Sequence, residues 1–177
     1  MVKDLSFIPE CFIDTCLTQV LLSVGVNHQH CCSQVTGTMA GFFKDRFAVG
    51  IIDNDKKKTS YVDEFVDVIR SQHFVVKKHQ NRPQYLILIC PAMERFILDC
   101  AKESGLKLSE YGLPSTLDGL CDQTKKEEAV TDSRFYTLFN DLAMVCPEVI
   151  KLKSCLCYLR NSVYSANEDG IRAIFDS

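Results

Sequence analysis

A short apolar run over residues 48–52 ends abruptly in the polar sequence Asp53-Asn54-Asp55. The run is too short to be a helix of its own and is typical of a strand buried on both faces in a parallel sheet. The two aspartates then fall at the carboxyl end of this strand, where open α/β sheets place their ligand sites. If the extended conformation continues through them, Asp53 and Asp55 point the same way, because side chains alternate along a strand.

Two carboxylates aimed at one point repel each other, so they favour a cation, a shared proton or a water molecule between them. The cations that suit such hard oxygen ligands are Mg²⁺ and Mn²⁺. A solvated turn is the alternative interpretation, because Asp-Asn-Asp-Lys is also ordinary turn composition. The rest of the chain has to decide between a metal site and a turn.

Hydrophobic periodicity predicts a repeated alternation of strands and helices over the first part of the chain. Strands are expected at residues 5–9, 48–52, 74–76 and 85–90, with residues 26–30 a brief strand or a loop. Helices are expected at residues 11–24, 32–43, 61–69 and 93–101. This alternation predicts an α/β domain over residues 1–105, with a mostly parallel sheet flanked by helices.

The sequence Tyr111-Gly112-Leu113-Pro114 has the composition of a domain boundary. Beyond it, residues 117–130, 135–145 and 147–164 favour helices and offer no convincing strand. Residues 106–177 are therefore predicted to form a small helical extension packed on the first domain.

The overall charge gives no support for binding to nucleic acid through a general excess of positive charge. The chain has 177 residues, 46% of them hydrophobic, and a net charge of −3. The charge is uneven, however, because five basic residues stand against one acid between positions 70 and 95. A local basic strip thus follows the strand that carries the aspartates.

The ten cysteines are expected to be reduced thiols of a cytoplasmic protein. The start of the chain lacks the features of a signal peptide, and no apolar run approaches the roughly 18 residues of a membrane span. No Cys-x-x-Cys pair is present, so most cysteines are interpreted as small buried hydrophobes. The sequence His28-Gln29-His30-Cys31-Cys32 is either a metal site or a strand-to-helix junction.

Acidic residues follow three of the predicted core strands. Glu10 ends the first strand, Asp14 lies one helical turn later on the same face, and Glu94 begins the helix after residues 85–90. Acids are favoured in the first turn of any helix, which explains Glu10 or Glu94 singly. Gathering several carboxylates costs several kcal/mol unless a metal neutralises them, and bound divalent ions serve phosphoryl transfer or phosphodiester hydrolysis. The coincidence at separate strands therefore favours the metal site.

A glutamate that closes the first strand, a helix, and an apolar strand ending in Asp-x-Asp together resemble the TOPRIM domain. The matching stretches are Phe7-Ile8-Pro9-Glu10-Cys11-Phe12-Ile13-Asp14 and Val49-Gly50-Ile51-Ile52-Asp53-Asn54-Asp55. Residues 91–98 are similar to a further acidic helix start in the small OLD-like and stand-alone TOPRIM proteins. The resemblance covers about residues 5–105 and implies a Rossmann-like fold of the kind shared by topoisomerases, bacterial-type primases and OLD nucleases.

The resemblance also implies roles for the acids. Glu10 would be a general acid or base or a metal ligand, and Asp53 and Asp55 would hold Mg²⁺ or Mn²⁺. Asp14 and Glu94 would be auxiliary metal-binding acids. The expected function is metal-dependent phosphodiester chemistry on nucleic acid, as in a nuclease.

Three lysines are candidates to steady phosphate oxygens at such a site, namely Lys56, Lys77 and Lys78. The alternative for them is a solvated, charged loop. An ATPase partner is implied by the resemblance alone, because the chain has no Gly-x-x-x-x-Gly-Lys-Ser/Thr loop.

Two other functions are open. The first is a catalytically inactive TOPRIM-fold binding module, which Cys11 favours because TOPRIM proteins usually have glycine after the first glutamate. The second is a response-regulator-like receiver domain, which also gathers acids at strand ends. A receiver needs a lysine at the end of a late strand, and residues 85–91 contain none.

Overall fold

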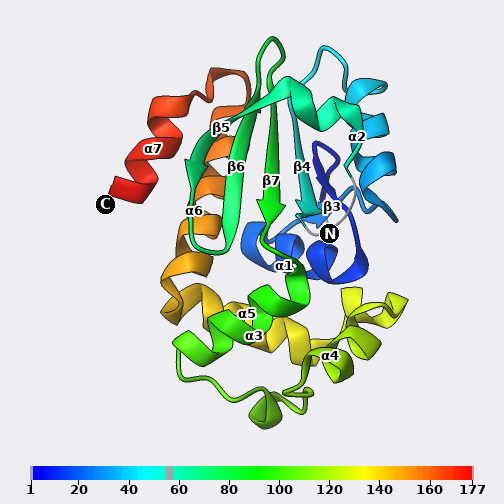
Figure 1. The fold of residues 1–177 in the computed structure, drawn as a ribbon, viewed down its shortest axis with the longest axis vertical. Helices are drawn as coiled ribbons and strands as arrows, with labels where there is room; N and C mark the ends of the chain where they lie inside the picture. The colour runs from blue at the N-terminus through cyan, green and yellow to red at the C-terminus, as the bar shows by residue number, and fades with distance from the viewer. Residues whose placement is uncertain (1, 55–57, 177) are drawn as a thin grey trace.

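The computed structural model describes residues 2–54 and 58–176 of the chain. Its centre is a five-stranded sheet with the strand order β2-β4-β7-β6-β5 (Figure 1). These strands are β2 (Phe7–Pro9), β4 (Ala48–Asp53), β5 (Phe65–Arg70), β6 (Phe74–His79) and β7 (Gln84–Ile89). A separate parallel pair joins β1 (Lys3–Asp4) to β3 (Gly25–Val26).

The sheet is mixed, which confirms the α/β class and corrects the expectation of a mostly parallel sheet. Strands β2, β4 and β7 run parallel to one another, whereas β6 is antiparallel to both β7 and β5. The connections explain this arrangement, because a parallel pair needs a crossover of about a dozen residues or more. Only residues 71–73 join β5 to β6, and only residues 80–83 join β6 to β7.

The helix predicted at residues 61–69 is wrong. The segment forms the 3₁₀-helix η1 (Ser60–Glu64) and then β5, which pairs with β6. Phe65 and Val68 are buried in the two different hydrophobic clusters, on opposite sides of the sheet, and the β5–β6 register shifts between Asp67 and Ile69. Burial on both faces of an irregular strand therefore produces the three-residue spacing that a helix would also show.

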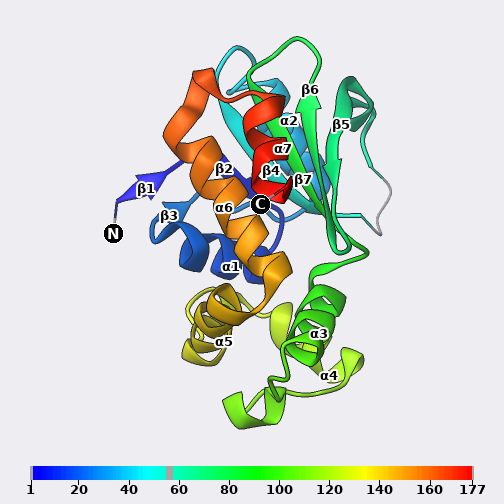
Figure 2. The ribbon, with the colours of Figure 1, turned by 90° about the vertical axis from the view of Figure 1, so that its left-hand side faces the viewer.

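Helices cover both faces of the sheet and extend beyond one of its edges (Figures 1 and 2). Among the described residues, the α-helices are α1 (Phe12–Leu22), α2 (Cys32–Ala40), α3 (Met93–Glu103), α4 (Leu117–Thr124), α5 (Ser133–Val145), α6 (Pro147–Ser162) and α7 (Glu168–Asp176). Further 3₁₀-helices are η2 (Leu108–Tyr111), η3 (Glu127–Val130) and η4 (Val163–Ser165). Helices α1, α3, α4 and α5 gather beyond the carboxyl ends of β4 and β7 (Figure 1).

Helix α2 packs closely against β4 because residue 50 is a glycine. A Cβ atom at Gly50 would lie 2.7 Å from Met39 Sδ on α2 and 2.7 Å from Leu86 Cδ2 on β7. Contacts this short cannot be accommodated without moving the neighbouring side chains. The glycine thus fixes how α2 lies on the strand that ends in Asp53.

The described residues after position 105 form helices that share one hydrophobic cluster with the sheet and with α1. Phe135 and Leu142 of α5 belong to this cluster together with Ile13 and Leu17 of α1, and all four are buried. The Tyr85 hydroxyl of β7 donates a hydrogen bond to the Ala166 carbonyl, 2.8 Å away. None of the described helices is long and apolar enough to cross a membrane.

Candidate functional site

Glu10 and Asp53 meet at the carboxyl edge of the sheet, where β2 and β4 lie side by side. Glu10 follows the last residue of β2, and Asp53 is the last residue of β4. Because Pro9 is in register with Ile51, the two strand ends lie at nearly the same level. The Asp53 backbone N–H donates a hydrogen bond to Glu10 Oε2 at 3.1 Å. Glu10 is 2% exposed and Asp53 is 5% exposed. The parallel pairing of two separate strands therefore brings these two buried acids together.

The Asp53 carboxylate also lies at the start of α3. Its Oδ1 atom accepts a hydrogen bond from the Met93 backbone N–H at 3.0 Å, and Met93 is the first residue of that helix. The N-cap residue Ala92 has no side chain that could do this. Because helix N-termini carry partial positive charge, this position favours the ionised form of Asp53.

Asp14 is a third acid at the same edge, and it is fully buried in the first turn of α1. Neither of its carboxylate oxygens has a hydrogen-bond partner among the described residues. Burial raises the pKa of Asp14 well above its usual range, and the charges of Asp53, Glu10 and Glu94 add to the rise, although the neighbouring Cys11 thiol favours the ionised form. A buried carboxylate that neighbouring carboxylates repel is the kind of group that a cation would stabilise.

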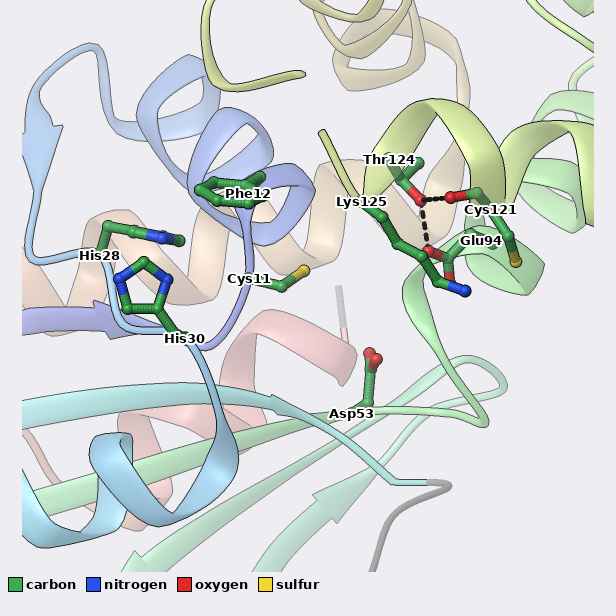
Figure 3. Close-up of a pocket in the computed structure, with 9 residues that line it drawn as sticks. All are labelled: Cys11, Phe12, His28, His30, Asp53, Glu94, Cys121, Thr124 and Lys125. Atoms are coloured by element: carbon green, nitrogen blue, oxygen red, sulfur yellow. Dashed lines mark hydrogen bonds between the residues drawn. The ribbon is translucent and has the colours of Figure 1, made fainter. Parts of the chain in front are cut away.

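Cys11 stands between Glu10 and α1, and its side chain lies above Asp53 at the cavity (Figure 3). Burial raises the pKa of this thiol, and the carboxylates of Asp14 and Asp53 raise it further. The thiol therefore stays protonated at neutral pH. Since the thiolate is the reactive form, Cys11 is not set up to act as a nucleophile.

A cavity of about 420 Å³ opens above Asp53 and Cys11 (Figure 3). One wall comes from the start of α1 and the loop after β3, and the opposite wall from α3 and the end of α4. The side chains that line the cavity are Cys11, Phe12, His28, His30, Asp53, Glu94, Cys121, Thr124 and Lys125. The candidate site is this cavity, with Asp53 at its base, together with the neighbouring buried acids Glu10 and Asp14, which do not line the cavity.

Glu94 lines the cavity but is held on the wall away from the strand ends. Its Oε1 atom accepts a hydrogen bond from the Thr124 hydroxyl at 2.5 Å, which ties the first turn of α3 to the end of α4. Lys125 extends along the same wall (Figure 3). Sequence reasoning did not find Thr124 and Lys125, because nothing local in the sequence marks a contact between residues 30 positions apart.

The predicted phosphate-binding lysines lie elsewhere or outside the described residues. Lys77 forms an ion pair with Asp67 on the neighbouring strand, with 2.7 Å between Nζ and Oδ1. The Lys78 ammonium donates a hydrogen bond to the His79 carbonyl at 3.2 Å. Neither lines the cavity above Asp53. Asp55 and Lys56 fall outside the described residues.

The histidines of the sequence His28-Gln29-His30-Cys31-Cys32 lie on the cavity wall. His28 Nδ1 lies 2.8 Å from the Thr15 hydroxyl, and its ring stacks on Phe12 with 4.8 Å between centroids. Cys31 Sγ lies 3.0 Å from the Ser33 hydroxyl, and Cys32 is buried in the core on the α2 side. The segment is the junction between β3 and α2.

The donor chemistry of the acidic edge fits a hard divalent cation, because Glu10, Asp14 and Asp53 supply carboxylate oxygens and those of Asp14 have no hydrogen-bond partner among the described residues. Within residues 2–54 and 58–176, however, no three histidine, cysteine, aspartate or glutamate side chains are grouped so that they could hold a metal ion. The described acids are thus assembled as neighbours and not as a closed coordination sphere.

Comparisons of the chain with protein-family models, with curated proteins and with solved structures find no match.

Proposed function

We propose that this chain is a TOPRIM-like protein that carries out Mg²⁺- or Mn²⁺-dependent phosphodiester chemistry on nucleic acid. The observation that carries the proposal is the hydrogen bond from the Asp53 amide to Glu10 Oε2, because it joins the two acids of the TOPRIM-like pattern at one edge of the sheet. The fully buried Asp14 carboxylate, which the charges of Glu10 and Asp53 repel, supports a cation at this edge.

In this proposal Asp53, Asp14 and Asp55 hold the ion, with Glu94 as an auxiliary acid on the cavity wall. When bound, the ion would polarise a phosphoryl oxygen and neutralise charge that develops on it. Glu10 either transfers a proton during the reaction or completes the ligand set. Its Oε2 atom is oriented by the Asp53 amide, so its position depends on the pairing of β2 with β4.

The same proposal places the protein in the cytoplasm, where reduced thiols persist, and all ten cysteines are free thiols. The TOPRIM resemblance alone suggests an ATPase partner, and any use of ATP would come from that partner, because the chain has no Gly-x-x-x-x-Gly-Lys-Ser/Thr loop.

The test is a cleavage assay on plasmid and single-stranded nucleic acid with Mg²⁺, with Mn²⁺ and with a chelator. Wild-type protein should cut only with metal, and Asp53→Asn should abolish cutting, since the amide keeps the acceptor for the Met93 N–H but loses the charge. The matched control is Asp169→Asn on α7, the same substitution at an exposed position, and it should cut like wild type. Cutting that survives Asp53→Asn would contradict the proposal.

A catalytically inactive TOPRIM-fold binding module is the second candidate. Two observations favour it. The Cys11 side chain occupies the base of the cavity, where it would crowd an approaching phosphate. The described residues also contain no three-residue metal group. Nucleic-acid binding by wild-type protein without cutting under any metal condition would favour this function over the first.

A further inference from the structure

We infer that the cavity above Asp53 accepts an unpaired nucleobase, so that the substrate of the proposed site is single-stranded nucleic acid or a frayed end. This inference rests on the proposed function for the identity of the ligand. It is carried by a separate observation, the aromatic wall that Phe12, His28 and His30 form on one side of the cavity.

The aromatic wall is a cluster of three mutually packed rings. Phe12 and His28 are stacked, with 4.8 Å between ring centroids and 17° between ring planes. His30 meets His28 edge to face, also at 4.8 Å, and meets Phe12 in the same manner at 6.0 Å. Figure 3 shows the three rings together on the side of the cavity opposite Glu94 and Lys125. Such a surface offers the π contact on which bases stack in sequence-tolerant complexes with single strands.

Phe12 and His28 are uncharged at neutral pH, and His28 is held in place before any ligand arrives. The Thr15 hydroxyl donates its proton to the Cys11 carbonyl at 2.7 Å, so its contact with His28 requires the proton on His28 Nδ1. Burial lowers the pKa of His28, and the neighbouring His30 lowers it further, which keeps the ring uncharged at neutral pH. A rigid, uncharged ring gains from stacking without first losing conformational freedom.

The other features of the cavity fit a nucleotide. Its volume of about 420 Å³ lies within the range of small-ligand pockets. Lys125 on the opposite wall supplies positive charge for a backbone phosphate, and Asp53 at the base lies where the proposed chemistry would occur. A base inside an intact duplex is stacked between its neighbours and cannot enter such a cavity without leaving the stack. The geometry therefore favours substrates whose bases are already unpaired.

The test measures binding by fluorescence anisotropy in EDTA, where no cleavage can occur. The probes are a labelled oligodeoxyadenylate, the same oligonucleotide with abasic residues, its duplex with oligodeoxythymidylate, and the matching oligoriboadenylate. Wild-type protein should bind the intact single strands about fivefold to tenfold more tightly than the abasic strand or the duplex, as expected for one stacked base.

Two variants remove the aromatic wall, and one serves as a control. Phe12→Leu keeps an apolar side chain where Phe12 packs on the core, and His30→Ala changes an exposed residue that the fold does not need. Both should lose the preference for intact single strands. Phe42→Leu removes an aromatic ring that is 66% exposed and lies outside the cavity, and it should behave like wild type.

The inference is overturned if wild-type protein binds abasic and intact strands equally, if it binds none of the probes, or if both wall variants keep the preference. Failure of the proposed function looks different, because it is the absence of metal-dependent cutting in a separate assay. A preference for intact strands in EDTA without any cutting would support base binding by the aromatic wall and contradict the proposed cleavage. Metal-dependent cutting that is unchanged in Phe12→Leu and His30→Ala would support the proposed cleavage and contradict base binding by the aromatic wall.

Discussion

Acidic residues have opposite environments in the parallel half of the sheet (β2, β4 and β7) and in its antiparallel half (β5 and β6). In the parallel half, Asp53 is buried at the end of β4 and Asp14 in the first turn of α1, and a backbone N–H at the start of α3 orients Asp53. In the antiparallel half, the Asp67 side chain is 41% exposed and forms two ion pairs. Its Oδ1 atom lies 2.7 Å from Lys77 Nζ, and its Oδ2 atom lies 2.8 Å from Arg70 Nη2. An exposed acid with two cationic neighbours needs no further explanation, whereas buried acids that repel one another do.

The pKa directions express the same difference. Burial and neighbouring charges raise the pKa of Asp14. The hydrogen bond from Lys77 lowers the pKa of Asp67 against the opposing effect of burial, and the hydrogen bond from Arg70 adds to the lowering. The surroundings of Asp14 therefore disfavour its ionised form in the absence of a cation, whereas Lys77 and Arg70 stabilise the ionised form of Asp67. Under the proposed function, the parallel half would bind a ligand and the ion pairs of the antiparallel half would serve stability.

The largest expected effect is on catalysis, from Glu10→Gln. The amide oxygen can still accept the Asp53 N–H, so the fold should persist, but the group can no longer transfer a proton or neutralise a metal. We expect metal-dependent cleavage to fall by about 100-fold or more, measured as initial rates on single-stranded substrate. Glu110→Gln makes the same change at an exposed position and should leave the rate unchanged. Full activity of Glu10→Gln would show that the parallel half is not the reaction site.

A smaller effect, on stability, separates the two halves directly. In metal-free buffer at neutral pH, Asp14→Asn should raise the free energy of unfolding by about 1–3 kcal/mol, because an amide has no charge to desolvate. Asp67→Asn should lower it by at most about 1 kcal/mol, since its ion pairs are exposed and screened. Urea denaturation measures both changes.

The stability difference at Asp14 should also depend on pH. A folded-state pKa above the unfolded value means that the folded protein binds the proton more tightly, so the contribution of Asp14 to wild-type stability is lost as the pH rises above about 4. Asp14→Asn lacks this dependence, and the gap between the two proteins should widen toward neutral pH. A gap that is constant between about pH 4 and pH 7 would contradict the position assigned to Asp14.

The smallest expected effect is on nucleic-acid affinity, and it compares a lysine from each region. Lys125→Gln removes a charge from the cavity wall and should weaken binding a few-fold while reducing the salt slope by about one. Lys77→Gln should change neither quantity, because its ammonium is already engaged by Asp67. Anisotropy titrations at several salt concentrations test both, and an equal loss in the two variants would remove the distinction.

The sequence was sufficient to predict where Asp53 falls in the fold, because strand ends are local features. An apolar run of five or six residues followed by an acid marks both the strand and the edge where the acid falls, and Asp53 lies at the end of β4 as expected. The hydrogen bond between Asp53 and Glu10 adds what local pattern cannot give, namely that β2 and β4 are neighbours.

The remaining features depend on contacts between distant parts of the chain. Lys77 is a candidate phosphate ligand from the sequence alone. The structure pairs it with Asp67 across the hairpin, and no local sequence pattern predicts that contact. Thr124 reaches Glu94 from a helix 30 positions away, and β5 was mistaken for a helix because it buries residues on both faces. In each case the missing information is the packing partner, which periodicity within one segment does not contain.

The most direct test of the central claim is a calorimetric titration of Mn²⁺ into wild-type protein, Asp53→Asn and Asp169→Asn. If buried acids at the parallel edge form the cation site, wild type and Asp169→Asn should show the same saturable heat of binding, and Asp53→Asn should show none. Equal binding by all three proteins, or no heat in wild type, would contradict it.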